Sequence, residues 1–212
     1  GPKSQGGLCN MVGEVVESCE RADTLADHFE HVQWATRPTV AVDRQPIAEA
    51  LPIATGEISD AEFLRAARAL HYGKAVGPDE LPAEFWRVVL EVGGAPATAV
   101  KQLFQRCWSE KAVPDTWHCT RVFTIFKKGD VSDCENYRPI CLVNTGYKLL
   151  AYILLHRFLD GGVEDRISET QYGFRRGRGS MEAMFMARRI IDFAKISKGG
   201  QVHLLALDWA RA

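Results

Sequence analysis

The sequence predicts an α+β protein that is mostly helical, with one β-hairpin and a further strand at its end. Three observations lead to this prediction. Apolar residues recur at helical spacing behind a clear helix start at Ser59. Two strand-like segments, 121–126 and 137–143, flank a polar loop. A continuous apolar run, 204–207, then delivers Asp208, and a carboxylate at the end of a buried strand needs a chemical reason.

The composition is that of a globular chain. Of its 212 residues, 46% are hydrophobic and 25% are charged, which suits one or two domains with a core. The longest nearly uninterrupted apolar run, 149–155, is far shorter than the about 20 residues that a membrane-spanning helix needs, and no secretion signal opens the chain. The six cysteines form no Cys-x-x-Cys pair, which favours reduced thiols over zinc ligands or disulfides. We expect a soluble protein from a reducing compartment.

Charge is distributed unevenly along the chain. Residues 1–62 carry four Lys and Arg against eleven Asp and Glu, whereas residues 63–212 carry 22 against 16. The basic excess is compatible with a surface that faces phosphates, although a solvated face of mixed charge is a commoner cause of such an excess. The acidic arm and its proline-containing linker, 1–57, form the first predicted region.

The early helices are predicted from their ends. Residues 21–34 form a helix with one apolar face, and prolines then mark the linker at 38, 46 and 52. Ser59-Asp60-Ala61-Glu62 is a capping box, with Ile58 and Phe63 placed as a hydrophobic staple. Pro82 and Pro96 open two further helices on either side of a break at Gly93-Gly94.

After Trp117 the residue pattern changes from helical spacing to strand-like segments. Strands 121–126 and 137–143 enclose the polar loop 127–136 and form a hairpin. Asn144 is predicted to cap a helix that reaches Phe158, and Ser180 to cap another that reaches about Ser197. Asp79 is predicted to cap the Gly-Pro-Asp turn at 77–79.

Five sequence blocks occur in a fixed order. They are Lys74-Ala-Val-Gly-Pro-Asp79 with Pro82-Ala-Glu-Phe-Trp86, Ile125-Phe-Lys-Lys-Gly-Asp130, Asn136-Tyr-Arg-Pro-Ile140, Gln171-Tyr-Gly-Phe-Arg175 with Gly177-Arg178, and Leu207-Asp-Trp-Ala-Arg-Ala212. This series resembles the reverse transcriptases of non-LTR retrotransposons over residues 57–212. The resemblance implies an incomplete right-hand polymerase fold, in which 58–200 is the fingers-like region and 201–212 is the first palm strand, truncated.

The resemblance also implies a nucleotide site on the hairpin. Lys127 or Lys128 and Arg138 match the cations that sit at the triphosphate of the incoming nucleotide. A guanidinium can fork onto phosphate oxygens while an ammonium acts as a movable point charge, so the pair is chemically reasonable. Taken alone, the two loop lysines are better explained as solvated side chains, whereas Arg138, between Tyr137 and Pro139, favours a functional role.

The block at 171–178 resembles the family segment near the template strand. Arg175 and Arg178 are the predicted template-binding residues, because guanidinium groups can follow a phosphate backbone. The block departs from the usual pattern, with Arg176 where proline is common and Gly179 where serine is common. A solvated arginine-rich turn is the alternative.

Asp208 resembles the first metal-binding aspartate of the polymerase palm. Two-metal polymerases hold two Mg²⁺ ions about 4 Å apart between several carboxylates. The other carboxylates come, in the family, from a paired-aspartate hairpin that these 212 residues lack. We therefore expect catalysis and Mg²⁺ binding at Asp208 in the complete parent enzyme, and neither in this chain alone.

Two function classes stay open. The first is a fragment of an RNA-directed DNA polymerase that contributes nucleotide-binding and template-binding fingers, with an RNA template and a DNA primer as partners. The second is a non-catalytic remnant that acts as a structural or binding subunit, with a protein partner paired to the terminal strand. A nucleic-acid-binding module without catalysis is a weaker third reading.

Overall fold

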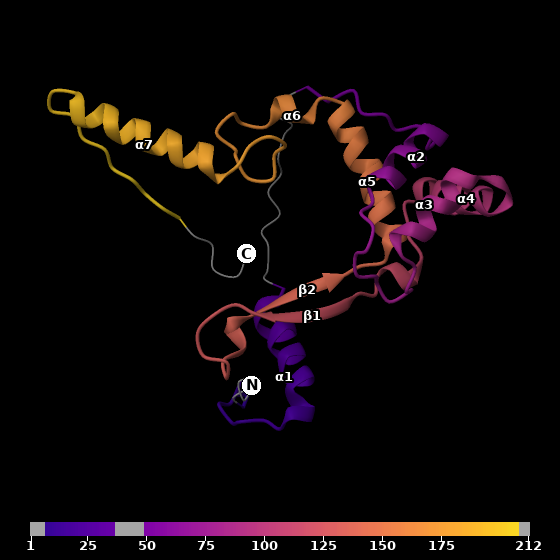
Figure 1. Cartoon of the computed structure of the whole chain (residues 1–212), viewed down its shortest axis with the longest axis horizontal. Helices are drawn as coiled ribbons and strands as arrows, with labels where there is room; N and C mark the ends of the chain where they lie inside the picture. The colour runs from indigo at the N-terminus through magenta and orange to yellow at the C-terminus, as the bar shows by residue number, and fades with distance from the viewer. Residues whose placement is uncertain (1–6, 37–48, 208–212) are drawn as a thin grey trace. The chain divides into compact units, whose positions relative to one another are not determined.

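The computed structural model describes residues 7–36 and 49–207. The chain divides into two compact units, Gly1–Asp160 and Gly161–Ala212, and each is described by itself. Helices predominate, and the described residues contain one sheet, which has two antiparallel strands (Figure 1). The predicted α+β class is therefore confirmed at this level.

The helices and strands follow the predicted order closely. The first unit contains α1 (Arg21–His28), continued by a π-helical turn (Phe29–Gln33), then α2 (Asp60–Ala69), α3 (Ala83–Val92), α4 (Gly94–Glu110), β1 (Arg121–Phe126), β2 (Tyr137–Leu142) and α5 (Thr145–Asp160). The second unit contains α6 (Val163–Arg166) and α7 (Ser180–Ile196). None of the helices described here is long and apolar enough to cross a membrane.

The start of α2 has the geometry that its sequence predicts. The Ser59 amide donates to Glu62 Oε2 at 2.8 Å, and the Glu62 amide donates to Ser59 Oγ at 3.3 Å. Ile58 and Phe63, the predicted staple, are 3% and 0% exposed. The capping box and its flanking apolar pair therefore fix where this helix begins.

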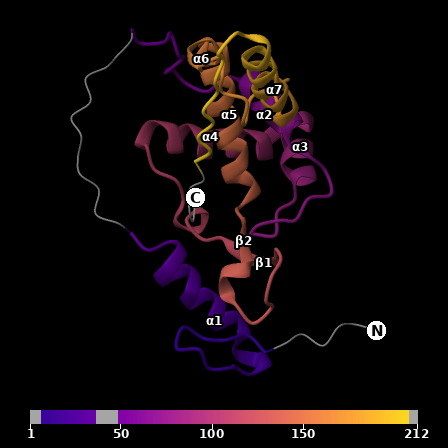
Figure 2. The same cartoon turned by 90° about the vertical axis from the view of Figure 1, so that its left-hand side faces the viewer.

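Helices α2, α3, α4 and α5 enclose the main hydrophobic core (Figure 2). Phe104 lies at its centre and contacts Phe63, Trp86 and Trp117 edge to face. A Cβ atom at Gly146 would come within 2.7 Å of the Trp117 ring, so only glycine lets α5 approach this cluster. Close packing of aromatic rings thus sets the path of α5.

A buried arginine joins α5 to the segment before α2. Arg157 is 4% exposed and forms a two-pronged ion pair with Glu62. Its remaining donors reach backbone carbonyls, and its guanidinium lies 4.5 Å from the centre of the Trp108 ring. The carbonyls belong to Ala54, Gly56 and Glu57. Hydrogen bonds from Arg157 lower the pKa of the Glu62 carboxyl to about 2.

Two predicted caps were wrong in detail. Asn144 precedes α5, but its side-chain oxygen accepts from the Asp79 amide at 3.2 Å and its amide donates to the Thr116 carbonyl at 2.8 Å. Asn144 holds the position before α5, since its backbone carbonyl accepts from the Lys148 amide at 3.2 Å, but its side chain binds the 77–79 turn and not the first turn of the helix. The last helix begins with Ser180 inside it, because Gly179 holds the cap position and donates its amide to Glu182 at 2.9 Å.

The predicted last strand is not formed in the described part of the chain. Residues 201–207 pair with no other described residues, and Leu204, Leu205 and Leu207 are 76%, 81% and 76% exposed. A strand exists only where neighbouring backbone groups accept its hydrogen bonds, and no described segment offers them here. Asp208 and the rest of the 201–212 segment lie outside the described residues.

Candidate nucleic-acid interface

The hairpin register decides which side chains share a face. Arg138 pairs with Ile125, and the Lys127 amide donates to the Asn136 carbonyl at 2.8 Å, which extends the ladder by one step. Directly opposed residues point to the same side of a sheet, as do residues two apart along one strand. Arg138 and Lys127 therefore belong to one face. We call it the cationic face, made of Arg121, Phe123, Ile125, Lys127, Arg138, Ile140 and Leu142.

The cationic face is exposed except at Leu142, which is half-buried. Its apolar members stand well out of the core, with Phe123 at 53%, Ile125 at 55% and Ile140 at 41% exposure. Arg121 is paired with Glu80 at 3.7 Å. Among the described residues, the side chains of Arg138 and Lys127 take part in no ion pair or hydrogen bond. Proteins hold nucleic-acid phosphates with unpaired cations and bases with exposed apolar surface, and this face carries both.

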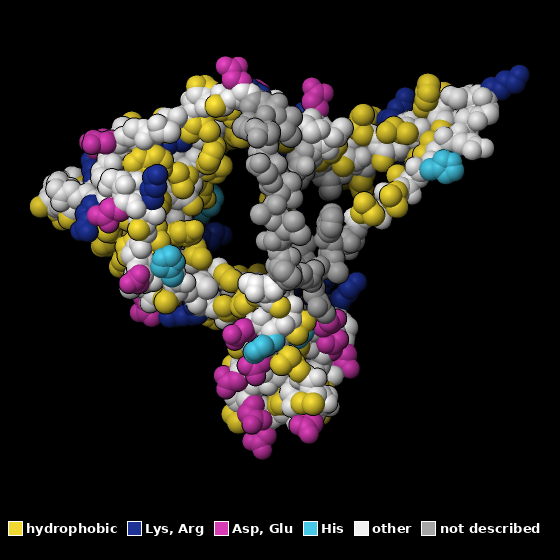
Figure 3. Space-filling model, turned by 180° about the vertical axis from the view of Figure 1, so that it is seen from behind, with side chains coloured by type: hydrophobic (Ala, Val, Ile, Leu, Met, Phe, Trp, Pro, Cys, Tyr) yellow, Lys and Arg dark blue, Asp and Glu magenta, His cyan; other side chains and the backbone are white. Residues whose placement is uncertain are grey.

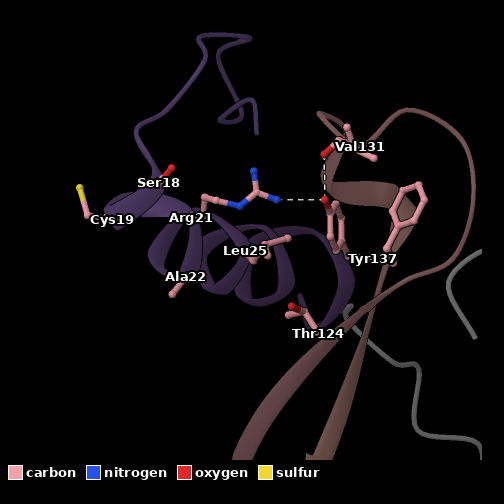
Figure 4. A pocket seen from close by; sticks show the side chains of 9 residues that line it. Ser18, Cys19, Arg21, Ala22, Leu25, Thr124, Val131 and Tyr137 are labelled. Carbon is pink, nitrogen blue, oxygen red and sulfur yellow. Dashed lines mark hydrogen bonds between the residues drawn. The ribbon is translucent and has the colours of Figure 1, made fainter. Parts of the chain in front are cut away.

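The opposite side of the hairpin meets α1, and we call it the helix side. A cavity of about 560 Å³ lies there, between α1 and the strands (Figure 4). Arg21 donates to the Tyr137 hydroxyl at 3.1 Å, and that hydroxyl donates to the Val131 carbonyl at 2.8 Å. A second, apolar cavity of about 490 Å³ is bordered by Phe29 and Trp34 and by three residues of β1, one of which, Phe123, belongs by register to the cationic face. The helix side is therefore partly covered within the chain itself.

Charge separates the two sides of the hairpin as well. Acidic side chains gather over α1 and the segment before it (Figure 3), at Glu14, Glu17, Glu20, Asp23, Asp27 and Glu30. A surface of this sign repels phosphate, whereas the cationic face attracts it. The helix side is thus the wrong side for a nucleic-acid backbone.

The loop between the strands is held by its own polar groups. Asp130 accepts from the Ser132 amide at 2.9 Å, a contact that lowers the pKa of the Asp130 carboxyl. Asn136 donates to the Asp130 carbonyl at 2.9 Å. Gly129 has a φ of +99° and packs against Asn136, which is a conformation that suits glycine alone. Lys128, the third predicted nucleotide contact, is exposed on this ordered loop.

In the second unit, Arg175 is committed to the chain itself. Its side chain is 12% exposed, and its Nε lies 3.1 Å from Glu164 Oε2. The other two nitrogens donate to the carbonyls of Ser168 at 2.9 Å and Glu164 at 3.2 Å. All three guanidinium nitrogens thus hold the loop that follows α6.

The other arginines of this loop are more open. Arg178 is exposed; it donates to the Glu169 carbonyl at 3.1 Å and lies 5.9 Å from the centre of the Tyr172 ring. Arg176 is exposed, and the described residues offer its side chain no partner. The template contact of Arg175 and Arg178 stays a prediction.

The same loop carries a residue that sequence reasoning missed. Phe174 has a φ of +57°, which is rare outside glycine, and its side chain is fully exposed. An unusual backbone conformation that presents an aromatic ring to solvent points to a contact surface. The only signal in the sequence is an aromatic residue between a glycine and two arginines, which no periodicity rule detects.

The described residues do not fit a Mg²⁺ site. They contain no group of three or more His, Cys, Asp or Glu that could hold a metal ion. Asp208, the predicted ligand, lies outside them.

Comparisons with known proteins point to one class. No protein-family model matches the chain. It is 28% identical over 160 residues, 73% of its length, to the retrovirus-related Pol polyprotein from type-1 retrotransposable element R1 of Bradysia coprophila. It is 27% identical over 176 residues, 77% of its length, to a probable RNA-directed DNA polymerase from transposon BS of Drosophila melanogaster. Residues over much of the chain thus form a reverse-transcriptase-like region, as the sequence blocks predicted.

Two further relatives are also transposon or retrotransposon proteins. The chain is 26% identical over 84% of its length to the transposon TX1 uncharacterized 149 kDa protein of Xenopus laevis. A putative 115 kDa protein in type-1 retrotransposable element R1DM of Drosophila melanogaster is 34% identical over 51% of the chain. The chain spans only 11% to 18% of the length of these four relatives.

Proposed function

We propose that this chain is the fingers-containing part of a retrotransposon RNA-directed DNA polymerase, and that the cationic face of its hairpin contacts the nucleotide and the template–primer. The observation that carries the proposal is the pair of unpaired cations, Arg138 and Lys127, on an exposed face within a reverse-transcriptase-like region. In this proposal, residues 58–200 are the fingers and 201–212 begin the palm.

The chemistry of the face supports this role. The Arg138 guanidinium can donate two parallel hydrogen bonds to phosphate oxygens, and Lys127 or Lys128 can neutralise a neighbouring charge. Ile125 and Ile140 flank Arg138 with apolar surface on which a base or sugar can rest. Phosphate contacts of this kind position a strand without reading its sequence.

The arginine loop of the second unit is the proposed template contact. Arg178 and Arg176 present exposed guanidinium groups, and Arg175 holds the backbone between them and α6. Phe174 adds an exposed ring that can stack on an unpaired base. Asp208 is proposed as a metal-binding and catalytic aspartate of the complete parent enzyme.

The alternative, a non-catalytic remnant that binds a protein partner, is favoured by a different observation. No residue of α7 is buried, although the helix carries large apolar side chains. Its Met184, Phe185, Phe193 and Ile196 are each at least 60% exposed. A surface of this kind is usually covered by another protein segment.

Binding of a labelled RNA–DNA hybrid, followed by fluorescence anisotropy at several salt concentrations, tests the proposal. The double variant Arg138→Ala with Lys127→Ala should bind more weakly and with a shallower salt dependence than the native chain. The matched control, Arg189→Ala with Lys195→Ala, removes one Arg and one Lys from exposed positions of α7. Equal losses in both double variants would reject a specific role for the hairpin face.

A further inference from the structure

A small cavity lies in the first unit, where the segment after α2 meets α5. Its volume is about 190 Å³. Three basic side chains line it, namely His71, Lys74 and Lys148. Leu70, Ala75, Ala83, Thr145 and Tyr152 complete the wall, so no carboxylate is part of the lining.

The two lysines are available for an external ligand. Among the described residues, neither Lys74 nor Lys148 forms an ion pair, whereas Lys101 on the neighbouring α4 lies 2.7 Å from Asp60. Glu84 follows Ala83 of the cavity wall in sequence, but its carboxylate is not part of the lining. Its Oε1 accepts from the Gly73 amide at 2.7 Å. Like charges that face one cavity repel each other unless an anion lies between them.

The wall adds polar groups of the kind that bind oxyanions. Thr145 is the first residue of the 16-residue helix α5, and it is buried. The first turn of a helix carries amide N–H groups without intrahelical partners and the positive end of the helix dipole. The Tyr152 phenol is a further donor on the same wall.

The size of the cavity limits the ligand. A volume of about 190 Å³ is smaller than the roughly 300–1,000 Å³ of pockets that enclose whole small molecules. It suffices for one tetrahedral oxyanion with some water, since a water molecule takes about 30 Å³ of liquid. A complete nucleotide would not fit, but one phosphate group of a longer molecule would.

The cavity lies at the root of the hairpin. Lys74 and Ala75 belong to the segment between α2 and α3, and Glu80 of that segment pairs with Arg121 at the start of β1. Thr145 follows the end of β2 by three residues. The cavity therefore belongs to the same unit as the hairpin, and Thr145 and the Glu80–Arg121 pair connect it to the ends of β1 and β2 that lie away from Lys127.

We propose that Lys74, Lys148 and His71 bind one phosphate group in this cavity, and that the group is a backbone phosphate of a nucleic-acid strand. The choice of nucleic acid as the source rests on the proposed function; the phosphate site itself does not. The contact is independent of sequence and lies apart from the residues matched to the triphosphate.

Two titrations test the site. In the first, inorganic phosphate is added to the isotope-labelled 212-residue chain, and the amide signals of Ala75, Thr145 and Lys148 are followed by NMR. In the second, a single-stranded oligoribonucleotide is added under the same conditions. Shifts at these amides with the oligoribonucleotide at lower concentration than with phosphate are the expected result. Shifts with inorganic phosphate alone would assign the site to free phosphate, and no shifts with either probe would overturn it.

A charge-matched pair of variants completes the test. Lys74→Gln with Lys148→Gln should abolish these shifts, weaken binding of the oligoribonucleotide several-fold and lower its salt slope by about 0.7, the value for one phosphate on a single strand. Lys195→Gln with Lys198→Gln should leave both unchanged. If the hairpin double variant binds normally while the cavity variant does not, the proposed function fails and the phosphate site stands. Normal binding by the cavity variant rejects the site.

Discussion

The hairpin and the arginine loop at 171–179 both carry cations that the resemblance places at phosphates, Lys127, Lys128 and Arg138 in the first and Arg175 and Arg178 in the second. Their cations are used differently. On the hairpin, Arg138 and Lys127 have no partner among the described residues, while in the loop Arg175 gives all its nitrogens to Glu164 and Ser168.

The difference has a physical cause. The facing backbone groups of the two strands pair with each other across the ladder, so they need no donor from the side chains of Arg138 and Lys127. The loop after α6 has no ladder, and its carbonyls need donors from elsewhere. A guanidinium, with five N–H groups in a planar fork, supplies several at once. A basic motif in an irregular loop is therefore weaker grounds for a ligand contact than the same motif on a strand.

The largest expected effect is at Arg157, a buried arginine of α5 that, like Arg175, is fully used in contacts within the chain. Arg157→Ala removes a 4% exposed cation, which takes the ion pair from Glu62 and a donor from each of three carbonyls. We expect the free energy of unfolding of the first unit to fall by about 3 kcal/mol or more. Urea unfolding followed by tryptophan fluorescence measures it, and a loss under about 1 kcal/mol would contradict the assigned role.

The Arg157–Glu62 pair also predicts a pH dependence. The pKa of Glu62 is about 2 in the folded chain, against an ordinary value of 4.5. A carboxyl whose pKa is lowered by folding stabilises the native state fully above its unfolded pKa, and this contribution is lost as the pH falls from about 4.5 toward 2. Urea midpoints across this range should fall less steeply in Glu62→Gln. Parallel curves for both proteins would remove Glu62 as the cause.

Arg138 is the contrasting case, an arginine whose side chain has no ion pair or hydrogen bond among the described residues. Arg138→Ala should change the free energy of unfolding by less than about 0.5 kcal/mol, because the side chain is exposed and unpaired. In a polymerase that contains this segment and the paired-aspartate hairpin, the same change should weaken nucleotide use by about 2 kcal/mol. Steady-state kinetics with varied nucleotide measures this. Wild-type nucleotide dependence would exclude Arg138 from the site.

Arg175 should show the opposite pattern. Arg175→Ala removes an ion pair and two hydrogen bonds from a mostly buried side chain, so we expect a local loss of about 1–2 kcal/mol. Hydrogen exchange of amides in residues 164–175 reports this loss. Arg176→Ala is the control, since its side chain is exposed and forms no ion pair or hydrogen bond with described residues. Equal exchange in both variants would contradict the structural role.

The smallest expected effect is at Arg178. Its one hydrogen bond to Glu169 and its distant contact with Tyr172 leave it free to reach a phosphate. Arg178→Ala should lower the salt slope of single-stranded RNA binding by about 0.7 and leave hydrogen exchange in the loop unchanged. An unchanged slope, combined with faster exchange, would make Arg178 a structural residue like Arg175.

Local features were predictable from the sequence, and distant ones were not. The α2 capping box spans four residues, and both hairpin strands end within one residue of their predicted bounds, because these features depend on near neighbours. Arg157 binds Glu62, 95 residues away, and Asn144 binds Asp79, 65 residues away. No pattern in either segment reveals such a partner.

In the candidate site too, local features were predictable from the sequence and contacts between distant residues were not. Alternation along the strands follows from sequence alone and puts Arg138 and Lys127 on one face. Whether a cation there is free or paired depends on the fold, as Arg175 shows. The strand predicted at 201–212 is not formed over 201–207, the part that the structure describes. Strand propensity alone does not form a sheet, because a strand needs a neighbour for its hydrogen bonds.

The most direct test of the central claim uses two adjacent residues of β1. Thr124 and Ile125 are both exposed, and alternation places them on opposite faces of the hairpin. Each is replaced in turn by the photoreactive residue p-benzoylphenylalanine, and cross-linking to a labelled RNA–DNA hybrid is quantified at low salt. The cationic-face account predicts strong cross-linking from position 125 and little from position 124. Equal cross-linking, or more from position 124 on the helix side, would contradict it.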